Sequence, residues 1–219
     1  MDMLFPRFCL SCGYVGSYLC KSCSLLLEPA APRCLYCEKK SLYGLTHPAC
    51  KRKWGVDGVF SFFKYDTLLK KVIHKGKYEG AWRVFGDVPL QTANLAEWVQ
   101  VCGGSAPYLH PVPLHPHKER ARGYNQAQKI ADLKLKPLTS QTTPLLARVK
   151  DTPSQAMSLT RAERKANMRD AFRFVGLHAP QTIMLVDDVI TTGATIDACA
   201  KQLKKNGVRT VLAISLARG

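Results

Sequence analysis

Residues 183–195 constrain the fold of this chain more than any other segment. Four apolar residues, Ile183–Val186, precede the adjacent carboxylates Asp187 and Asp188, and a threonine-rich loop around Gly193 follows. An uninterrupted apolar run of this length is typical of a strand that is buried on both faces of a parallel sheet. We therefore expect the two carboxylates at the carboxyl end of such a strand, where open α/β sheets bind their ligands.

The loop after the carboxylates suits a phosphate group. Thr191–Thr195 offers three hydroxyls and several backbone N–H groups directly before an expected helix. N–H groups at a helix N-terminus attract anions, and carboxylates accept hydrogen bonds from sugar hydroxyls. Two neighbouring like charges also repel each other unless something is bound beside them. The segment therefore predicts a sugar-phosphate site in preference to an ordinary polar turn.

Strand and helix signals alternate over residues 59–216, which predicts an α/β sheet flanked by helices. The expected strands are 59–65, 108–114, 172–175, 183–187 and 210–215, with a short strand region and a loop in 134–150. The expected helices are 68–73, 81–101, 125–133 and 194–205. We expect a basic segment broken by glycines at 74–80 and a mobile polar segment at 151–170.

Metal-ligand pairs crowd the first 50 residues, and in each pair two residues separate the ligands: Cys9 and Cys12, Cys20 and Cys23, Cys34 and Cys37, His47 and Cys50. This gap lets one turn of backbone direct both side chains at one tetrahedral metal. Eight ligands make two zinc sites. The spacing allows the first pair to join the second and the third to join the fourth, and it equally allows a crossed arrangement. Because protein ligands would fill all four positions, we expect structural zinc rather than catalytic zinc.

These pairs also suggest how the chain is divided. Residues 1–54 have too few apolar side chains to fold without metal, so we expect a zinc-binding module there and the α/β domain at 55–219. No stretch approaches the roughly 20 apolar residues of a membrane span, and the first residues do not form a signal peptide. We therefore expect a cytoplasmic protein with reduced cysteines.

The formal net charge of +16 predicts an anionic partner. Residues 118–173 hold 13 Lys/Arg against five Asp/Glu. One basic group in this region precedes an expected helix and suits a diphosphate, because guanidinium groups bind oxygens in pairs: Lys118, Arg120 and Arg122. A second group has the spacing of one helix face and suits either a phosphate lid or a DNA backbone, a role that we also expect for Lys118: Arg161, Arg164, Lys165 and Arg169.

The segment 183–195 resembles the phosphoribosyl-diphosphate (PRPP) motif of the type I phosphoribosyltransferases. The resemblance implies that Asp187 and Asp188 hold the ribose hydroxyls. It also implies a set of residues around the 5′-phosphate: Thr191, Thr192, Gly193, Ala194 and Thr195. Arg120 and Arg122 are the expected diphosphate ligands.

Nearly the whole chain resembles the ComF family of competence proteins. The matching pieces are the cysteine pairs, Lys77–Gly80, Val112–Leu114, Arg122–Gln126, Thr152–Gln155, Arg164–Met168, Ala171–Phe172 and Val186–Thr195. His47 departs from the family, which often has cysteine there, but histidine also binds zinc.

The ComF resemblance implies a role in natural transformation. It implies single-stranded DNA as a partner, together with a ComFA-like helicase and the inner-membrane DNA channel. Four aromatic residues near basic side chains are candidates for base stacking: Trp54, Tyr78, Trp82 and Tyr124. The alternative is an active phosphoribosyltransferase that uses PRPP with Mg²⁺ and in which Asp187 and Asp188 are catalytic. We favour binding over catalysis, because no residue of the chain is an evident catalytic base.

Overall fold

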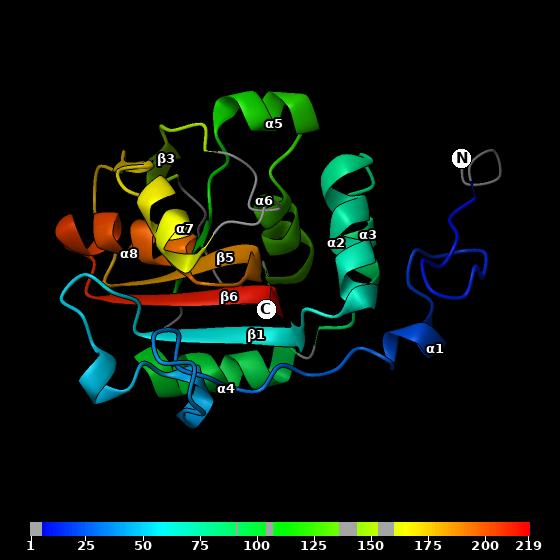
Figure 1. Cartoon of the computed structure of the whole chain (residues 1–219), viewed down its shortest axis with the longest axis horizontal. Helices are drawn as coiled ribbons and strands as arrows, with labels where there is room; N and C mark the ends of the chain where they lie inside the picture. The colour runs from blue at the N-terminus through cyan, green and yellow to red at the C-terminus, as the bar shows by residue number, and fades with distance from the viewer. Residues whose placement is uncertain (1–5, 91, 104–106, 136–143, 153–159) are drawn as a thin grey trace.

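The computed structural model describes residues 6–90, 92–103, 107–135, 144–152 and 160–219. A four-stranded parallel sheet lies at its centre, in the order β1-β6-β5-β2 (Figure 1). These strands are Gly58–Lys64 (β1), Tyr108–Pro111 (β2), Thr182–Ile190 (β5) and Thr210–Arg218 (β6). Two short strands, Leu146–Arg148 (β3) and Phe172–Phe174 (β4), form a separate antiparallel pair. The α/β architecture predicted from the sequence is confirmed.

Strand β5 continues beyond the predicted end at residue 187. It runs to Ile190 and pairs with β6 up to Arg218, so Asp187 and Asp188 lie within the strand near its carboxyl end. Because successive side chains of a strand point to opposite faces, the two carboxylates face different layers of the protein.

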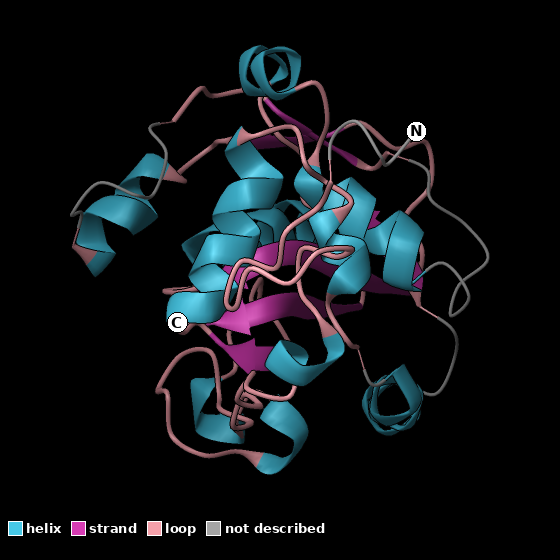
Figure 2. Cartoon of the chain, turned by 90° about the vertical axis from the view of Figure 1, so that its right-hand side faces the viewer, coloured by secondary structure: helices cyan, strands magenta, loops and turns pink. Residues whose placement is uncertain are grey.

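Helices cover both faces of the sheet (Figure 2). One face packs against Thr67–Tyr78 (α2), Val84–Asp87 (α3), Thr92–Gly103 (α4) and Gln126–Ile130 (α6), which continues as a π-helical turn, Ala131–Leu135 (η3). The other face packs against Ala194–Lys205 (α8) and the β3–β4 pair, and Arg161–Asn167 (α7) contacts α8. Pro116–Arg122 (α5) follows β2 in the chain and lies at the top of Figure 1. None of the helices in the described part is long and apolar enough to cross a membrane.

Helix α2 differs from its prediction. The sequence predicted a helix over 68–73 and a glycine-broken segment over 74–80, yet the helix is continuous to Tyr78. Gly76 is buried inside it, and a Cβ there would lie only 2.4 Å from the Phe85 ring. The glycine therefore allows the close approach of Phe85. The predicted helix over 81–101 is divided into α3 and α4 near Pro89, which lacks a backbone donor.

The polar segment predicted to be mobile lies only partly within the described residues. Its second half forms α7, and Thr160 and Glu163 close a capping box at its N-terminus. A capping box satisfies two backbone donors at the helix start. This part of the segment is therefore an ordered helix, whereas residues 153–159 lie outside the described part.

The N-terminal segment packs along the edge strand β1. Its short helices are Lys21–Ser24 (α1), Leu42–Gly44 (η1) and Pro48–Cys50 (η2). Between the first two, the chain runs along β1, where Ala30 N–H donates to the Phe62 carbonyl and Lys64 N–H to the Glu28 carbonyl (Figure 1). The division at residues 54 and 55 stays a prediction.

Candidate functional site

A cleft of about 810 Å³ lies at the carboxyl ends of β2 and β5. It is lined by Leu10, Tyr65, Lys70, Lys71, Ile73, His74, Lys75, Lys77, Tyr78, Glu79, Val112, Leu114, Lys118, Arg122, Gln126, Arg148, Arg164, Asp187, Asp188, Val189, Thr191 and Thr195. Eight of these residues are Lys or Arg and three are Asp or Glu. The lining therefore favours an anionic ligand.

Asp187 and Asp188 lie together in this cleft, as predicted. Asp187 Oδ1 accepts a hydrogen bond from the Asp188 N–H at 2.9 Å, and Asp188 Oδ1 accepts one from the Val189 N–H at 2.9 Å. Burial raises the pKa of Asp187 to about 8, the charge of Asp188 adds to the rise, and Lys77 opposes it. The raised pKa therefore favours the protonated form of Asp187 near neutral pH.

Lys77 is a site residue that the sequence analysis did not assign. Its Nζ lies 2.6 Å from Asp188 Oδ2, and the two side chains are only 22% and 4% exposed. Burial disfavours the charged form of Lys77, but the carboxylates of Asp188 and Asp187 outweigh it and raise the pKa. The lysine is therefore charged and neutralises the strand end.

Only part of the loop after β5, which the sequence predicted to surround a phosphate, faces the cleft. Thr191 and Thr195 line the cleft, whereas Thr192, Gly193 and Ala194 are not among its lining residues. Thr192 Oγ1 instead accepts a hydrogen bond from the Ala194 N–H at 3.4 Å. Gly193 precedes α8 with a φ of +74°, a left-handed conformation that favours glycine.

Two predicted basic side chains reach the cleft from α5, and one reaches it from α7. Lys118 Nζ donates to the Thr152 carbonyl, and Arg122 donates to the Gln126 side chain. Arg164 Nη1 donates to Thr191 Oγ1 at 3.2 Å, which joins α7 directly to the predicted phosphate loop. The remaining predicted cations are not brought into the cleft: Arg120 and Arg169 are exposed and do not line it, and the side chains of Arg161 and Lys165 lie outside the described part.

Arg148 on β3 was also missed by the sequence analysis, because a lone arginine in a weak strand region carries no signal. It lines the cleft, and its guanidinium donates to Thr152 Oγ1. The Nε atoms of Arg148 and Arg164 are buried and make no hydrogen bond to described residues. Buried donors of this kind are costly unless a ligand or water satisfies them, so they favour an anion in the cleft.

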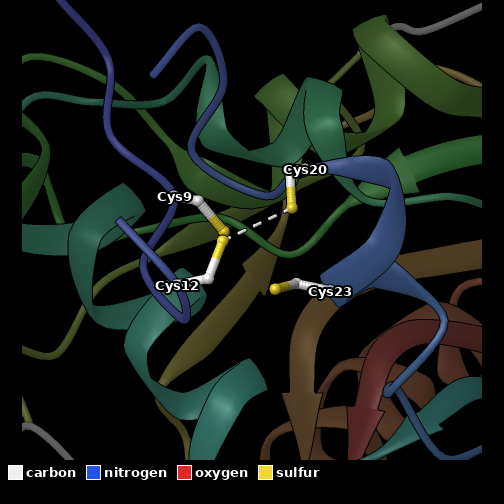
Figure 3. A group of neighbouring side chains, drawn as sticks. All are labelled: Cys9, Cys12, Cys20 and Cys23. Atoms are coloured by element: carbon white, nitrogen blue, oxygen red, sulfur yellow. Dashed lines mark hydrogen bonds between the residues drawn. The ribbon is translucent and has the colours of Figure 1, made fainter. Parts of the chain in front are cut away.

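Four cysteines form the first candidate metal site (Figure 3). The sulfurs of Cys9, Cys12, Cys20 and Cys23 lie within 4.8 Å of one another, and those of Cys12 and Cys20 are 3.7 Å apart. Zn–S bonds of about 2.3 Å place neighbouring sulfurs of a tetrahedron about 3.8 Å apart. Burial raises the pKa of Cys9, but backbone N–H groups of Cys12 and Cys20 lower it to about 6. The cluster therefore fits zinc.

The second candidate metal site is formed by Cys34, Cys37, His47 and Cys50, whose ligand atoms also lie within 4.8 Å of one another. His47 Nδ1 is 3.2 Å from Cys37 Sγ, and His47 Nε2 is 3.2 Å from the Lys40 carbonyl. An Nε2–H that donates to this carbonyl leaves Nδ1 free to bind a metal, as in many zinc sites. In both clusters, ligand pairs that are consecutive in the sequence share one site: the first pair joins the second, and the third joins the fourth. The crossed pairing that the spacing also allowed is not seen.

The second cluster packs against the phosphate loop. Leu35 and Tyr36 lie between the ligands Cys34 and Cys37. A Cβ on Gly193 would lie 2.4 Å from Leu35 Cδ1. The Tyr36 hydroxyl donates to Asp197 Oδ1 in the first turn of α8 at 2.7 Å, and burial raises the pKa of this hydroxyl beyond its usual range. The cluster thus supports the start of α8.

Substituting Gly193 tests this contact. We expect Gly193→Ala to lower the free energy of unfolding by about 2–4 kcal/mol, because it combines a positive φ with overlap against Leu35. Gly80→Ala is the matched control: its φ is +67° and nothing lies within 4 Å, so about 1–2 kcal/mol is expected. Urea denaturation measures both. If the two variants lost the same free energy of unfolding, the contact between Gly193 and Leu35 would be contradicted.

The four candidate stacking residues all lie beside cations or the cleft. Lys53 lies over the Trp54 ring and Lys129 over the Trp82 ring, with 4.9 and 4.7 Å between the nitrogen and the ring centre. Tyr78 is 55% exposed and lines the cleft. Tyr124 has a structural contact instead, because its hydroxyl donates a hydrogen bond to the Gly76 carbonyl.

A second cavity, of about 990 Å³, lies against β1 and Trp98. Its lining is mostly apolar. It includes neither the carboxylates Asp187 and Asp188 nor the loop Thr191–Thr195. The cleft at the carboxyl ends of the strands is therefore the better candidate for a phosphate ligand.

Comparison with known proteins gives two relatives that span most of the chain. Competence protein F of Haemophilus influenzae is 26% identical over 215 residues, which cover 91% of this chain and 90% of the relative. Competence protein ComFC of Streptococcus pneumoniae is 26% identical over 209 residues, which cover 92% and 88%. DNA utilization protein YhgH of Salmonella typhimurium is 37% identical over 119 residues, which cover 49% and 47%. No protein-family model matches the chain.

Fold and site together define an α/β protein with a parallel sheet, a basic cleft at its carboxyl edge and an N-terminal segment that can hold two metal ions. The relatives agree with the motifs found in the sequence. Over most of its length the chain is similar to competence proteins F and ComFC, in agreement with the resemblance to the ComF family seen in the sequence.

Proposed function

We propose that this protein acts in natural transformation by handling incoming single-stranded DNA in the cytoplasm. The names of its relatives, competence proteins and DNA utilization proteins, support a role in competence and DNA uptake. The net charge of +16 supports a polyanionic partner. A ComFA-like helicase and the inner-membrane DNA channel are the protein partners that the family resemblance implies.

One observation carries the proposal: the strand-end carboxylates and eight basic side chains line a single cleft. Asp187 and Asp188 suit ribose hydroxyls, and Thr191 with Arg164 suits a 5′-phosphate. The other cations that line the cleft are Lys70, Lys71, Lys75, Lys77, Lys118, Arg122 and Arg148. The cleft would thus hold one sugar phosphate, either PRPP or the 5′ end of a strand, while Tyr78 at its rim stacks on a base.

Two structural zinc ions complete the proposal. Each would be held by four protein ligands, one by the cluster of Cys9 and the other by the cluster of Cys34. Zinc bound in this way supplies folding energy and leaves no position for a substrate. A zinc-dependent reaction is therefore not proposed.

The salt dependence of binding tests the DNA role. With about four phosphate contacts, the affinity for a short single-stranded oligonucleotide should fall about 50-fold between ~50 and ~200 mM salt. Arg122→Gln should weaken binding and reduce the slope of log affinity against log salt concentration by about 0.7. The control is Arg209→Gln: Arg209 is exposed and lies at the amino end of β6, away from the cleft. Fluorescence anisotropy measures both. A flat salt response, or no binding at low salt, would exclude the role.

A further inference from the structure

Both carboxylate oxygens of Asp188 are engaged inside the protein, Oδ1 in a hydrogen bond and Oδ2 in an ion pair. Oδ1 accepts a hydrogen bond from the Val189 N–H at 2.9 Å, and Oδ2 lies 2.6 Å from Lys77 Nζ. The Asp188 side chain is 4% exposed. A pair this deeply buried is little screened by solvent, and either charge would be strongly destabilising without the other.

Helix α2 brings Lys77 to this place on a well-anchored backbone. Asp66 caps the helix by accepting the Leu69 N–H at 2.7 Å. Near the other end, the Phe85 ring fills the space beside Gly76, and the Tyr124 hydroxyl donates to the Gly76 carbonyl. The residue directly before Lys77 is thus fixed from two sides, so the ammonium group approaches Asp188 from a rigid support.

The magnesium ion that the family resemblance implies does not fit this arrangement. Mg²⁺ requires about six oxygen ligands at ~2.0–2.1 Å and is usually bound through one or two carboxylates. At Asp188, the ammonium nitrogen of Lys77 lies beside Oδ2, in the place that a magnesium ion bound to this carboxylate would take. Asp187 is a poor substitute, because burial raises its pKa to about 8 and a ligating carboxylate must be deprotonated.

The charges in the cleft also favour a ligand with one phosphate. The ion pair of Lys77 with Asp188 carries no net charge, and burial raises the pKa of Asp187 to about 8, so the strand end repels an anion little. Lys118 and Arg122 line the same cleft but already donate to Thr152 and Gln126. Of the cations beside Thr191, Arg164 donates to its hydroxyl, and the Nε atoms of Arg164 and Arg148 are buried without a described partner, so these two guanidinium groups are the phosphate partners. This set suits a phosphate monoester, while the strand end presents polar groups to the sugar.

We propose that Lys77 takes the place of a divalent cation beside Asp188, and that the cleft binds a pentose 5-phosphate without Mg²⁺. The inference rests on the proposed sugar-phosphate site and specifies its ligand class: a sugar with a single 5-phosphate, such as the 5′-phosphorylated end of a strand. A magnesium diphosphate is not needed for recognition.

Calorimetry with ribose 5-phosphate tests this inference on the full chain loaded with zinc. Magnesium-free buffer is prepared without chelator, which would also remove zinc. We expect the wild-type affinity to change less than about twofold when ~5 mM Mg²⁺ is added. Lys77→Met should bind about tenfold more weakly without Mg²⁺ and recover on its addition, because the carboxylates then need another cation. Lys77→Arg keeps the charge and should stay independent of magnesium.

The control variant is Lys201→Met, which removes an exposed lysine from α8 outside the cleft and should behave as the wild type. Wild-type binding that rises tenfold or more with Mg²⁺ would overturn the inference and leave the sugar-phosphate site standing. Lys77→Met with wild-type affinity in both buffers would overturn it as well. If folded wild type binds ribose 5-phosphate in neither buffer, the proposed site fails together with the inference.

Discussion

Removing zinc is expected to unfold the segment of both cysteine clusters and to lower the thermal midpoint of the chain by about 10 °C or more. The segment is built from helices of three or four residues and from turns, so it has little regular structure to stabilise it without metal. Native mass spectrometry should find two zinc ions per chain. Amide hydrogen exchange should then show that protection is lost after chelation, for example at the N–H groups of Cys9 and Cys34, which are hydrogen-bonded within the clusters.

Single substitutions separate the two zinc sites. Cys37→Ser should remove one zinc ion and weaken phosphate binding in the cleft, because Leu35 and Tyr36 pack against Gly193 and Asp197. Cys12→Ser should remove the other zinc ion with a smaller effect on that binding. Cys102→Ser, outside both clusters, is the control and should keep both ions. A chain purified without zinc, or unchanged exchange after chelation, would contradict the zinc sites.

Replacing both strand-end carboxylates, Asp187→Asn with Asp188→Asn, is expected to weaken PRPP binding about 100-fold or more. Asp188 would accept charge-assisted hydrogen bonds from ribose hydroxyls, at roughly 1.5–3 kcal/mol, and Asp187, whose pKa is raised to about 8, would add a weaker one of roughly 0.5–1.5 kcal/mol. Asparagine keeps the shape of the side chain and removes the charge. The measurement is calorimetry with PRPP on variants whose folding has been checked by circular dichroism.

Asp132→Asn is the matched control for this loss of negative charge. Asp132 accepts a hydrogen bond from the Gln128 side chain at an exposed position outside the cleft, so its replacement should leave PRPP affinity unchanged. If the double variant were folded and kept the wild-type affinity, the ribose-binding role of the carboxylates would be wrong.

The features that could be predicted from the sequence are local ones. The two-residue gaps between Cys9 and Cys12 and between Cys34 and Cys37 fix where the side chains can meet, and both metal clusters are confirmed as groupings. The apolar run before Asp187 predicted a buried parallel strand for the same reason: burial on both faces requires apolar residues throughout. The central strands and α8 follow the prediction closely.

The features that could not be predicted depend on tertiary packing. Lys77 reaches Asp188 only because α2 continues past Gly76, and it continues because Phe85, nine residues farther along the chain, packs where a side chain would have been. Arg148 enters the cleft from a strand that pairs with β4 rather than with the central sheet. Neither contact leaves a pattern of spacing or composition in the sequence.

The measurement that tests the central claim most directly is a calorimetric titration of PRPP into the zinc-loaded wild type, alone and with a saturating single-stranded oligonucleotide. If one cleft serves both ligands, PRPP should bind at one site per chain, and the oligonucleotide should weaken that binding. No measurable PRPP binding by a folded chain that contains two zinc ions would contradict the sugar-phosphate site. PRPP binding that the oligonucleotide leaves unchanged would contradict the claim that the DNA strand occupies this cleft.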